Sequence, residues 1–264
     1  MIIADRKKVL FVHIEKTGGS SITTLLTPHI SKKYRSENAK MPGSGSGWRQ
    51  TWHINRQHAR FSSSLPLLDK FGIDPQEYFK FTVVRNPYSW LLSIWGNRYQ
   101  SPMNVKKTLS NRLRFIVAEL TGIKKFHSQH FHQMYPDGSF KSFVLFIDYL
   151  VSNYPPSFTK GYLGVDDQYS YIENDRNFKF DFIAKLENLD RDLNKINQIV
   201  HLNDDLKVPH LNKESKTKNR EKYLDFYDDE SIAIVNRIFA RDFKFFGYQP
   251  IANLAEYQKD SVAV

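Results

Sequence analysis

Apolar and polar positions follow two regular patterns along the chain, and together they predict repeated strand-turn-helix units. Five of the six residues 9–14 are apolar and predict a short buried strand, and apolar residues at helical spacing follow between 22 and 26. The same order returns at residues 79–84, which are β-branched and aromatic, and a helix with an apolar face is predicted to begin at Pro87. Each unit thus runs from a buried strand through a short polar turn into a helix.

The last third of the chain repeats this organisation. Residues 140–151 predict a core helix, residues from about 178 to 186 predict a strand, and residues 189–200 predict an amphipathic helix. Repeated units of this kind favour an α/β fold with a central parallel sheet flanked by helices, whose ligands bind at the carboxyl ends of the strands. We therefore expect a single domain over residues 1–264, with a C-terminal tail from about 249 to 264.

The turn after the first predicted strand has the composition of an anion-binding loop. Its sequence, EKTGGSS, holds a glycine pair that lets the backbone approach a ligand closely, and Ser20 and Ser21 lie at the start of the next helix, whose amides attract anions. A Walker A loop carries its lysine after the glycines, whereas Lys16 precedes them. The turn therefore predicts a phosphate-type site and weakens a nucleoside triphosphatase interpretation, although a structural Gly-Gly turn has the same composition.

The turn after the second predicted strand supplies a second candidate for binding phosphate. Arg85 ends that strand, and a guanidinium can hold a phosphate through two parallel hydrogen bonds. Ser93 follows on the helix that begins at Pro87, on the same face as Ser89. An arginine that only forms an ion pair at a strand end remains the alternative at this position.

Both turns resemble motifs of one enzyme family. Residues 16–21 resemble the 5′-phosphosulfate-binding loop of sulfotransferases that use 3′-phosphoadenosine 5′-phosphosulfate (PAPS), and HIEKTGGSSI is similar to the uronosyl 2-O type of carbohydrate sulfotransferase. RNPYSWLLS is similar to the 3′-phosphate motif of the same family, and the resemblance spans about residues 8–248. It implies a P-loop-like sulfotransferase fold, PAPS as donor and 3′-phosphoadenosine 5′-phosphate (PAP) as product. The cofactor-binding residues that it implies are Lys16, Thr17, Gly18, Gly19, Ser20, Ser21, Arg85, Ser93, Ser215, Lys216 and Lys218.

A histidine is the expected catalytic base. Sulfuryl transfer to an alcohol requires removal of the hydroxyl proton, and histidine has the side-chain pKa closest to neutral pH. QHARF resembles the histidine-containing segment that supplies the base in this family, which selects His58, whereas His53 matches less well. Lys16 would neutralise the charge that grows on the departing 5′-phosphate. Gln168 falls in a segment that resembles one near which acceptor contacts occur in relatives.

Three further histidines suggest a metal site only at first sight. His127, His130 and His132 have suitable spacing, but no carboxylate of matching geometry accompanies them, and sulfuryl transfer needs no metal. The chain also contains no cysteine, so thiolate metal sites and disulfides are excluded. We therefore expect no metal cofactor.

Charge and composition narrow the choice of partners. The formal net charge is +10, which favours nucleic acid, an anionic membrane surface, or an anionic cofactor and substrate. No motif for reading nucleic acid is present, and no apolar run reaches membrane-spanning length, so we expect no nucleic-acid partner and no transmembrane segment. We expect a soluble, bacterial-type cytoplasmic protein, unlike the animal carbohydrate sulfotransferases, which carry a membrane anchor.

The acceptor is less constrained than the donor. The resemblance favours a hydroxyl group of a glycan, with acidic glycans included, and a small metabolite or a lipid-linked acceptor is the open alternative. Residues 32–57 predict a mobile surface loop, and a loop that closes over the acceptor is a second possibility. Two other functions stay open: a P-loop kinase, which would require magnesium and a triphosphate, and a noncatalytic protein that binds acidic glycans.

Overall fold

The described residues of the chain group into two compact units. The computed structural model describes residues 1–34, 58–100, 127–156, 165–202, 222–255 and 257. The first unit, here called the sheet unit, comprises residues 1–86, 167–218 and 244–248. The second, here called the helical unit, comprises residues 87–166, 219–243 and 249–264. The expectation of a single domain stays a prediction.

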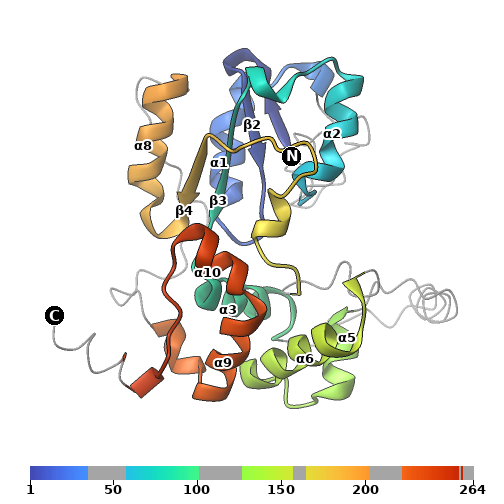
Figure 1. The fold of residues 1–264 in the computed structure, drawn as a ribbon, viewed down its shortest axis with the longest axis vertical. Helices are drawn as coiled ribbons and strands as arrows, with labels where there is room; N and C mark the ends of the chain where they lie inside the picture. Colours follow the sequence, from blue (N-terminus) through green and yellow to red (C-terminus); the bar gives the residue numbers. More distant parts are fainter. Residues whose placement is uncertain (35–57, 101–126, 157–164, 203–221, 256, 258–264) are drawn as a thin grey trace, which may run out of the picture. The chain divides into compact units, whose positions relative to one another are not determined.

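The sheet unit is built on a four-stranded sheet (Figure 1). The strands lie side by side in the order β1, β2, β3 and β4, with bounds Ile2–Ala4, Val9–Val12, Phe79–Val84 and Phe182–Lys185. β2, β3 and β4 are parallel, and β1 pairs with β2 in the antiparallel direction. The predicted central parallel sheet is therefore confirmed, and β1 adds an antiparallel edge strand that the sequence pattern did not predict.

The register of the strands brings their carboxyl ends to one edge of the sheet. Val12 lies opposite Thr82 and Val84 lies opposite Lys185. The buried Thr82 hydroxyl donates a hydrogen bond to the Val12 carbonyl at 2.8 Å, which ties β2 to β3 beyond the ladder. The chain segments that follow β2, β3 and β4 therefore start from the same edge.

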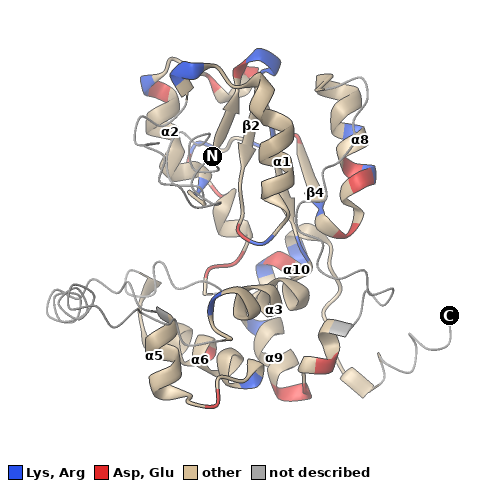
Figure 2. Ribbon diagram, turned by 180° about the vertical axis from the view of Figure 1, so that it is seen from behind, with Lys and Arg blue, Asp and Glu red and all other residues tan. Residues whose placement is uncertain are grey.

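Helices cover the sheet because each has an apolar stripe. In α2, the stripe consists of Phe61, Leu65 and Leu68, all buried, at positions that share one helical face. α1 lies against one face of the sheet, behind the strands in Figure 1 and in front of them in Figure 2. The helices of this unit are α1 Gly19–Leu26, α2 Phe61–Lys70 and α8 Leu189–Val200, together with the end of α10 Ala240–Phe246.

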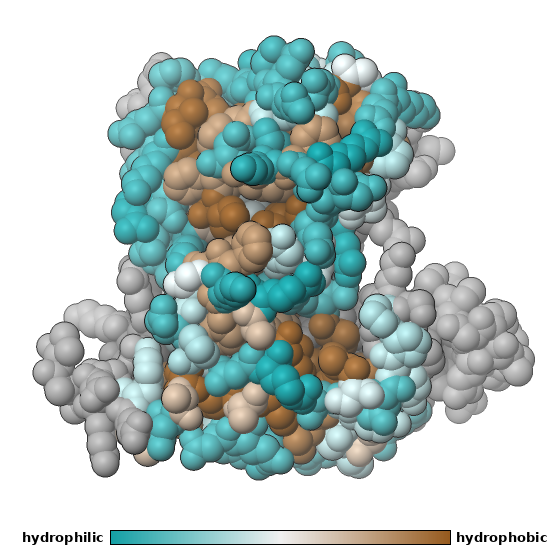
Figure 3. All heavy atoms as spheres, viewed as in Figure 1, coloured by the Kyte–Doolittle hydropathy of each residue, from teal (hydrophilic) through white to brown (hydrophobic). Residues whose placement is uncertain are grey.

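The surface that Figure 3 shows is largely hydrophilic, with apolar residues between the polar ones. The large apolar side chains that are exposed in the sheet unit come from separate elements: Phe71 after α2, Ile199 in α8 and Phe245 in α10. Scattered exposed residues of this kind are normal for a folded protein surface. Among the described residues, no helix has the length and apolar character needed to cross a membrane.

The helical unit has an aromatic core. The predicted core helix over residues 140–151 is confirmed by α6 Phe140–Asn153, whose Phe143, Phe146, Ile147 and Leu150 are fully buried. The rings of Tyr99 and Phe143 lie 4.5 Å apart between their centroids. The other α-helices that the structure describes in this unit are α3 Pro87–Arg98, α5 His127–Met134, α9 Asp229–Ile238 and the start of α10.

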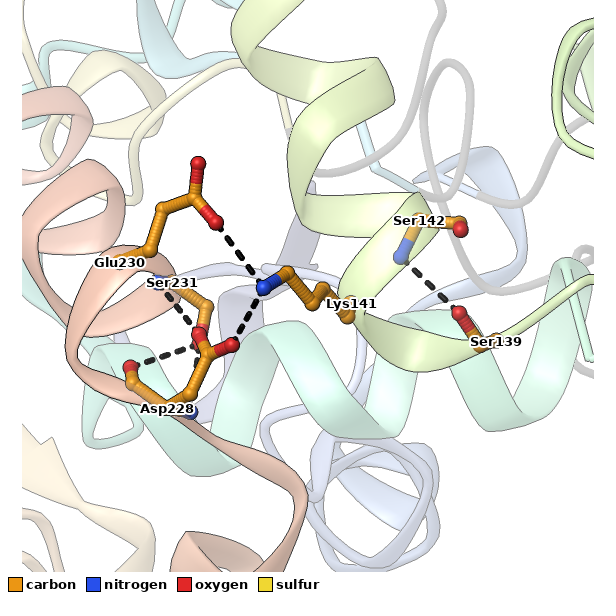
Figure 4. Close-up of polar contacts among 6 residues, drawn as sticks. All are labelled: Ser139, Lys141, Ser142, Asp228, Glu230 and Ser231. Carbon is orange, nitrogen blue, oxygen red and sulfur yellow. Dashed lines mark hydrogen bonds and ion pairs between the residues drawn. The ribbon is translucent and has the colours of Figure 1, made fainter.

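Two helix starts in the helical unit are joined by one lysine (Figure 4). Asp228 and Ser231 form a capping box at the start of α9. Lys141, in the first turn of α6, forms ion pairs with Asp228 at 2.6 Å and with Glu230 at 2.9 Å. The Lys141 ammonium is the main reason that the pKa of Asp228 falls from 3.8 to about 2, and the two carboxylates raise the pKa of Lys141.

A buried tyrosine at the start of α3 ties this unit together. Tyr88 donates to the side-chain oxygen of Asn236 and accepts from the Ile251 amide at 2.8 Å. The Tyr227 hydroxyl donates to the Tyr88 carbonyl at 2.9 Å. Burial raises the pKa of Tyr88 to about 12, so its hydroxyl stays protonated and remains a donor.

Candidate functional site

The loop between β2 and α1 has an unusual backbone. Lys16 has a φ of 63° and Gly18 a φ of 82°, so two residues of this short loop are left-handed. For a residue other than glycine this conformation costs about 1–2 kcal/mol, and strain of this kind clusters at functional sites. The two turns lead the chain from the carboxyl end of β2 into α1, whose first amides lie at that edge of the sheet.

Hydrogen bonds within the loop hold this shape. Thr17 is fully buried, and its hydroxyl donates to the Ile14 carbonyl at 3.0 Å. The Ser21 amide donates to the Gly18 carbonyl at 3.0 Å, and the Thr23 hydroxyl donates to the Gly19 carbonyl at 2.7 Å. The Thr17 hydroxyl thus stabilises the loop from within. The cationic group of the loop is the half-buried side chain of Lys16.

The glycine pair makes room for side chains of the protein itself. A Cβ atom added at Gly19 would lie 2.0 Å from Cδ2 and Nε2 of His13. A Cβ atom added at Gly18 would lie 2.8 Å from Leu186, at a φ that disfavours any side chain. His13 and Leu186 thus occupy the space beside the two glycines, while the close approach of a ligand to their backbone stays a prediction.

His13 links the loop to the predicted base. Its ring is 3% exposed, packs against Gly19, and lies 5.6 Å from the Phe11 ring and 4.6 Å from the His58 ring between centroids. Nδ1 of His58 lies 3.1 Å from the His13 carbonyl oxygen. Because a carbonyl oxygen only accepts hydrogen bonds, this contact requires a proton on Nδ1 of His58.

Arg85 lies beside the same loop. Its Nη1 donates to the Lys16 carbonyl oxygen at 3.4 Å, and the residue is half-buried directly after β3. Its main-chain amide and carbonyl are both hydrogen-bonded to the side chain of Gln168. The structure therefore brings together the loop of residues 16–21, His58 and Arg85 within the sheet unit.

The remaining predicted site residues fall elsewhere. Ser93 lies in α3 and belongs to the helical unit, where it is half-buried. Ser215, Lys216 and Lys218 lie outside the described residues, as do His53 and the predicted loop beyond Tyr34. The structure describes no group of three or more metal-ligating side chains in the ranges it covers.

Much of the described positive charge of the sheet unit lies away from this site. A basic cluster surrounds the amino end of β2 (Figure 2), where Arg6 donates to the Pro28 carbonyl and Lys8 pairs with Glu77 at 3.2 Å. Lys32 and Lys33 follow in a nearby exposed turn. At the opposite, carboxyl end of the strands, Lys16 lies in the loop and Arg85 contacts it, so the net charge of +10 does not by itself locate the site.

Sequence reasoning did not predict the contacts that three residues make in this arrangement. His13 ends an apolar run and has the local pattern of a buried strand residue, so nothing local marks its contact with His58. Gln168 and Glu187 bind main-chain groups of Arg85 and Asn86 from 83 and 101 residues away. Contacts of this length carry no local sequence signal.

A mostly parallel sheet whose second strand enters a helix through a Gly-Gly turn places the protein among α/β proteins with a phosphate-type loop. The model of the sulfotransferase family matches residues 1–249, and the chain belongs to that family. It is therefore assigned to the enzymes that transfer a sulfuryl group. No curated protein and no solved structure matches the chain.

Proposed function

We propose that this protein transfers the sulfuryl group of PAPS to a hydroxyl group of an acceptor, and that the acceptor is a glycan. The observation that carries the proposal is the contact between Arg85 and the Lys16 carbonyl, because it puts the Arg85 guanidinium beside the loop that contains Lys16 and leads into α1. Membership of the sulfotransferase family supports the reaction class. The glycan acceptor follows from the resemblance of residues 13–22 to the uronosyl 2-O type.

The donor set fits a cofactor with two anionic ends. Lys16 and the first amides of α1 suit the 5′-phosphosulfate, and the Arg85 guanidinium suits the 3′-phosphate. In this proposal Gly18, Gly19, Ser20 and Ser21 bind through the loop and the helix start, and Thr17 maintains their shape. The family resemblance alone adds Ser93, Ser215, Lys216 and Lys218 to this set. PAPS supplies the sulfuryl group when it is bound.

His58 is the proposed base. With a proton on Nδ1 directed at the His13 carbonyl, the neutral imidazole of His58 carries its lone pair on Nε2. That nitrogen can accept the proton of an acceptor hydroxyl. The carbonyl of a buried residue thereby fixes both the tautomer and the orientation of the ring before any ligand binds.

Lys16 is the proposed electrostatic catalyst. A cation that lies at the place where negative charge develops stabilises the transition state more than the ground state. The main chain of Lys16 adopts a left-handed φ in the turn that leads into α1, and the hydrogen bond of the buried Thr17 beside it stabilises that turn. No step in this mechanism requires a metal ion.

The reaction is tested by incubating the purified chain with PAPS and a panel of glycans, acidic and neutral, and by analysing the products by mass spectrometry. The proposal expects PAP release and addition of a sulfuryl group to an acceptor, with both rates lowered by about 10²–10³ in Lys16→Ala. Hydrolysis of magnesium ATP would support the kinase alternative. Glycan binding that survives His58→Ala and yields no sulfated product would support the noncatalytic alternative.

A further inference from the structure

Two acidic or amide side chains outside the loop hold the main chain at the end of β3. Gln168 has no exposed surface, and its Oε1 accepts from the Arg85 amide at 2.8 Å while its Nε2 donates to the Arg85 carbonyl at 2.7 Å. Glu187 accepts from the Asn86 amide at 2.7 Å through Oε1 and from the Tyr248 hydroxyl at 2.8 Å through Oε2. Three consecutive polar groups of the main chain at residues 85–86 are therefore bound by side chains.

These side-chain hydrogen bonds bind the main chain directly beyond the last paired residues of β3 and β4. The last pair of β3 with β4 joins Val84 to Lys185, so Arg85 is the first residue beyond it. The side-chain amide of Gln168 offers one donor and one acceptor, which is the pair that a neighbouring strand offers to a strand residue. Gln168 therefore keeps Arg85 in an ordered main-chain conformation at a position where a strand normally frays.

We propose that Gln168 and Glu187 are positioning residues for the binding of the 3′-phosphate, because they fix the main chain from which the Arg85 guanidinium extends. This inference rests on the proposed function, in which Arg85 binds that phosphate. Both carboxylate oxygens of Glu187 accept from neutral donors: Oε1 accepts from the Asn86 amide, and Oε2 accepts from the Tyr248 hydroxyl, so neither of these contacts is with the guanidinium. Neither residue needs to touch the ligand.

The chain contains a second clamp of the same chemistry that serves as a control. Asn174 accepts from the Phe178 amide at 2.9 Å through Oδ1 and donates to the Phe178 carbonyl at 3.0 Å through Nδ2. This clamp lies in the sheet unit and holds the chain ahead of β4. Each of the two amide side chains accepts from a main-chain amide and donates to the carbonyl of the same residue. Only Gln168 makes these two hydrogen bonds with Arg85.

The matched substitutions are Gln168→Glu and Asn174→Asp. Each keeps the size of the side chain and one acceptor oxygen, and each replaces the NH2 donor with an oxygen that faces a main-chain carbonyl. Affinities of the full chain for PAP and for adenosine 5′-phosphate, which lacks the 3′-phosphate, are measured by calorimetry. Gln168→Glu is expected to weaken PAP binding on the order of tenfold and to leave adenosine 5′-phosphate binding within about twofold. Asn174→Asp is expected to leave both affinities unchanged.

A second measurement distinguishes an effect through Arg85 from general loss of structure. In an Arg85→Ala background, Gln168→Glu is expected to cause no further loss of PAP affinity, because the group that it positions is gone. Additive losses would overturn the inference. If Gln168→Glu does not fold, Glu187→Ala carries the same test, since Glu187 is only half-buried.

The outcomes separate this inference from the proposed function. If Arg85→Ala weakens PAP binding and neither Gln168→Glu nor Glu187→Ala does, the positioning role is wrong and the proposed function stands. If the unsubstituted protein does not bind PAP, or Arg85→Ala has no effect on it, the proposed 3′-phosphate site is wrong and the inference falls with it. Selective loss of PAP affinity over adenosine 5′-phosphate affinity supports both.

Discussion

Gly19→Ala tests the arrangement of the loop, His13 and His58 with the smallest possible change. The new methyl carbon would lie 2.0 Å from two atoms of the His13 ring. Carbon atoms in contact are about 3.5–4.0 Å apart, so the ring would have to move by about 1.5 Å or more. It has little room to do so, because it is 3% exposed and lies between Phe11, Gly19 and His58.

The expected loss is one of stability and of turnover. Overpacking of this kind costs about 1–3 kcal/mol, and we expect urea denaturation to show a decrease of that size in the free energy of unfolding. A displacement of about 1 Å at a catalytic group can lower the rate about 10²-fold, so turnover should fall by that order because His58 rests on His13. The turnover is measured as the steady-state rate of PAP release from PAPS in the presence of an acceptor that the protein sulfates.

Two comparisons make the result specific. Gly96→Ala introduces the same methyl group in α3, where the structure places nothing within 4 Å of it, and should raise stability by about 0.5–1 kcal/mol. Gly19→Ala should lower the free energy of unfolding less in a His13→Ala background than in the unsubstituted protein, since removal of the His13 ring vacates the space that the methyl group needs. If Gly19→Ala were as stable and as active as the unsubstituted protein, the packing of His13 on the loop described above would be wrong.

Four further predictions concern single groups. Lys16→Ala should lower turnover by about 10²–10³ while leaving the unfolding midpoint nearly unchanged, as compared by steady-state kinetics and thermal denaturation. His58→Ala should lower turnover with PAP affinity nearly intact by calorimetry, and a large loss of affinity would point to a structural role instead. Asp228→Ala should cost about 0.5–2 kcal/mol at neutral pH through loss of the α9 cap. Because the Lys141 ammonium holds the folded pKa of Asp228 below 3.8, at about 2, the stabilisation by the charged carboxylate is present above pH 3.8 and is lost as the pH falls towards 2. The free energies of unfolding of the unsubstituted protein and of Asp228→Ala, measured as a function of pH, should therefore converge in that range. A difference that stays constant with pH would contradict the assignment. Tyr88→Phe leaves the buried Ile251 amide without its hydroxyl partner and should cost about 1–3 kcal/mol in urea denaturation, whereas an unchanged midpoint would show that the hydrogen bond is unimportant.

The sequence predicted those parts of the fold in which neighbouring residues share one environment. β3 occupies residues 79–84 and α3 begins at Pro87, as expected from a buried apolar run followed by a good helix start. α6 covers the predicted core helix because its apolar stripe recurs at helical spacing. The strand expected from about 178 to 186 is shorter, at Phe182–Lys185. Ahead of it, Asn174 binds the main chain of Phe178, and the Asp181 carboxylate, rather than a main-chain carbonyl, accepts from the Lys80 amide.

Other features depend on distant partners and were not predictable in this way. β1 has only three residues and exists because β2 pairs with it. The loop of residues 16–21 and Arg85 were recognised as anion-binding candidates from their residue types, but the carbonyl of His13 beneath His58 is a main-chain group that has no sequence signature. Gln168 was noted only for its resemblance to a segment near which acceptor contacts occur, and the bond from its side chain to the main chain of Arg85, 83 residues away, was not predicted.

The central claim is that the Lys16 loop and Arg85 form the two ends of a PAPS site, and calorimetric titration with PAP tests it most directly. Magnesium ATP serves as the control ligand, and Arg85→Ala as the control protein. The account predicts tight binding of PAP that weakens in Arg85→Ala and that magnesium ATP does not match. No binding of PAP, or a preference for magnesium ATP, would contradict it.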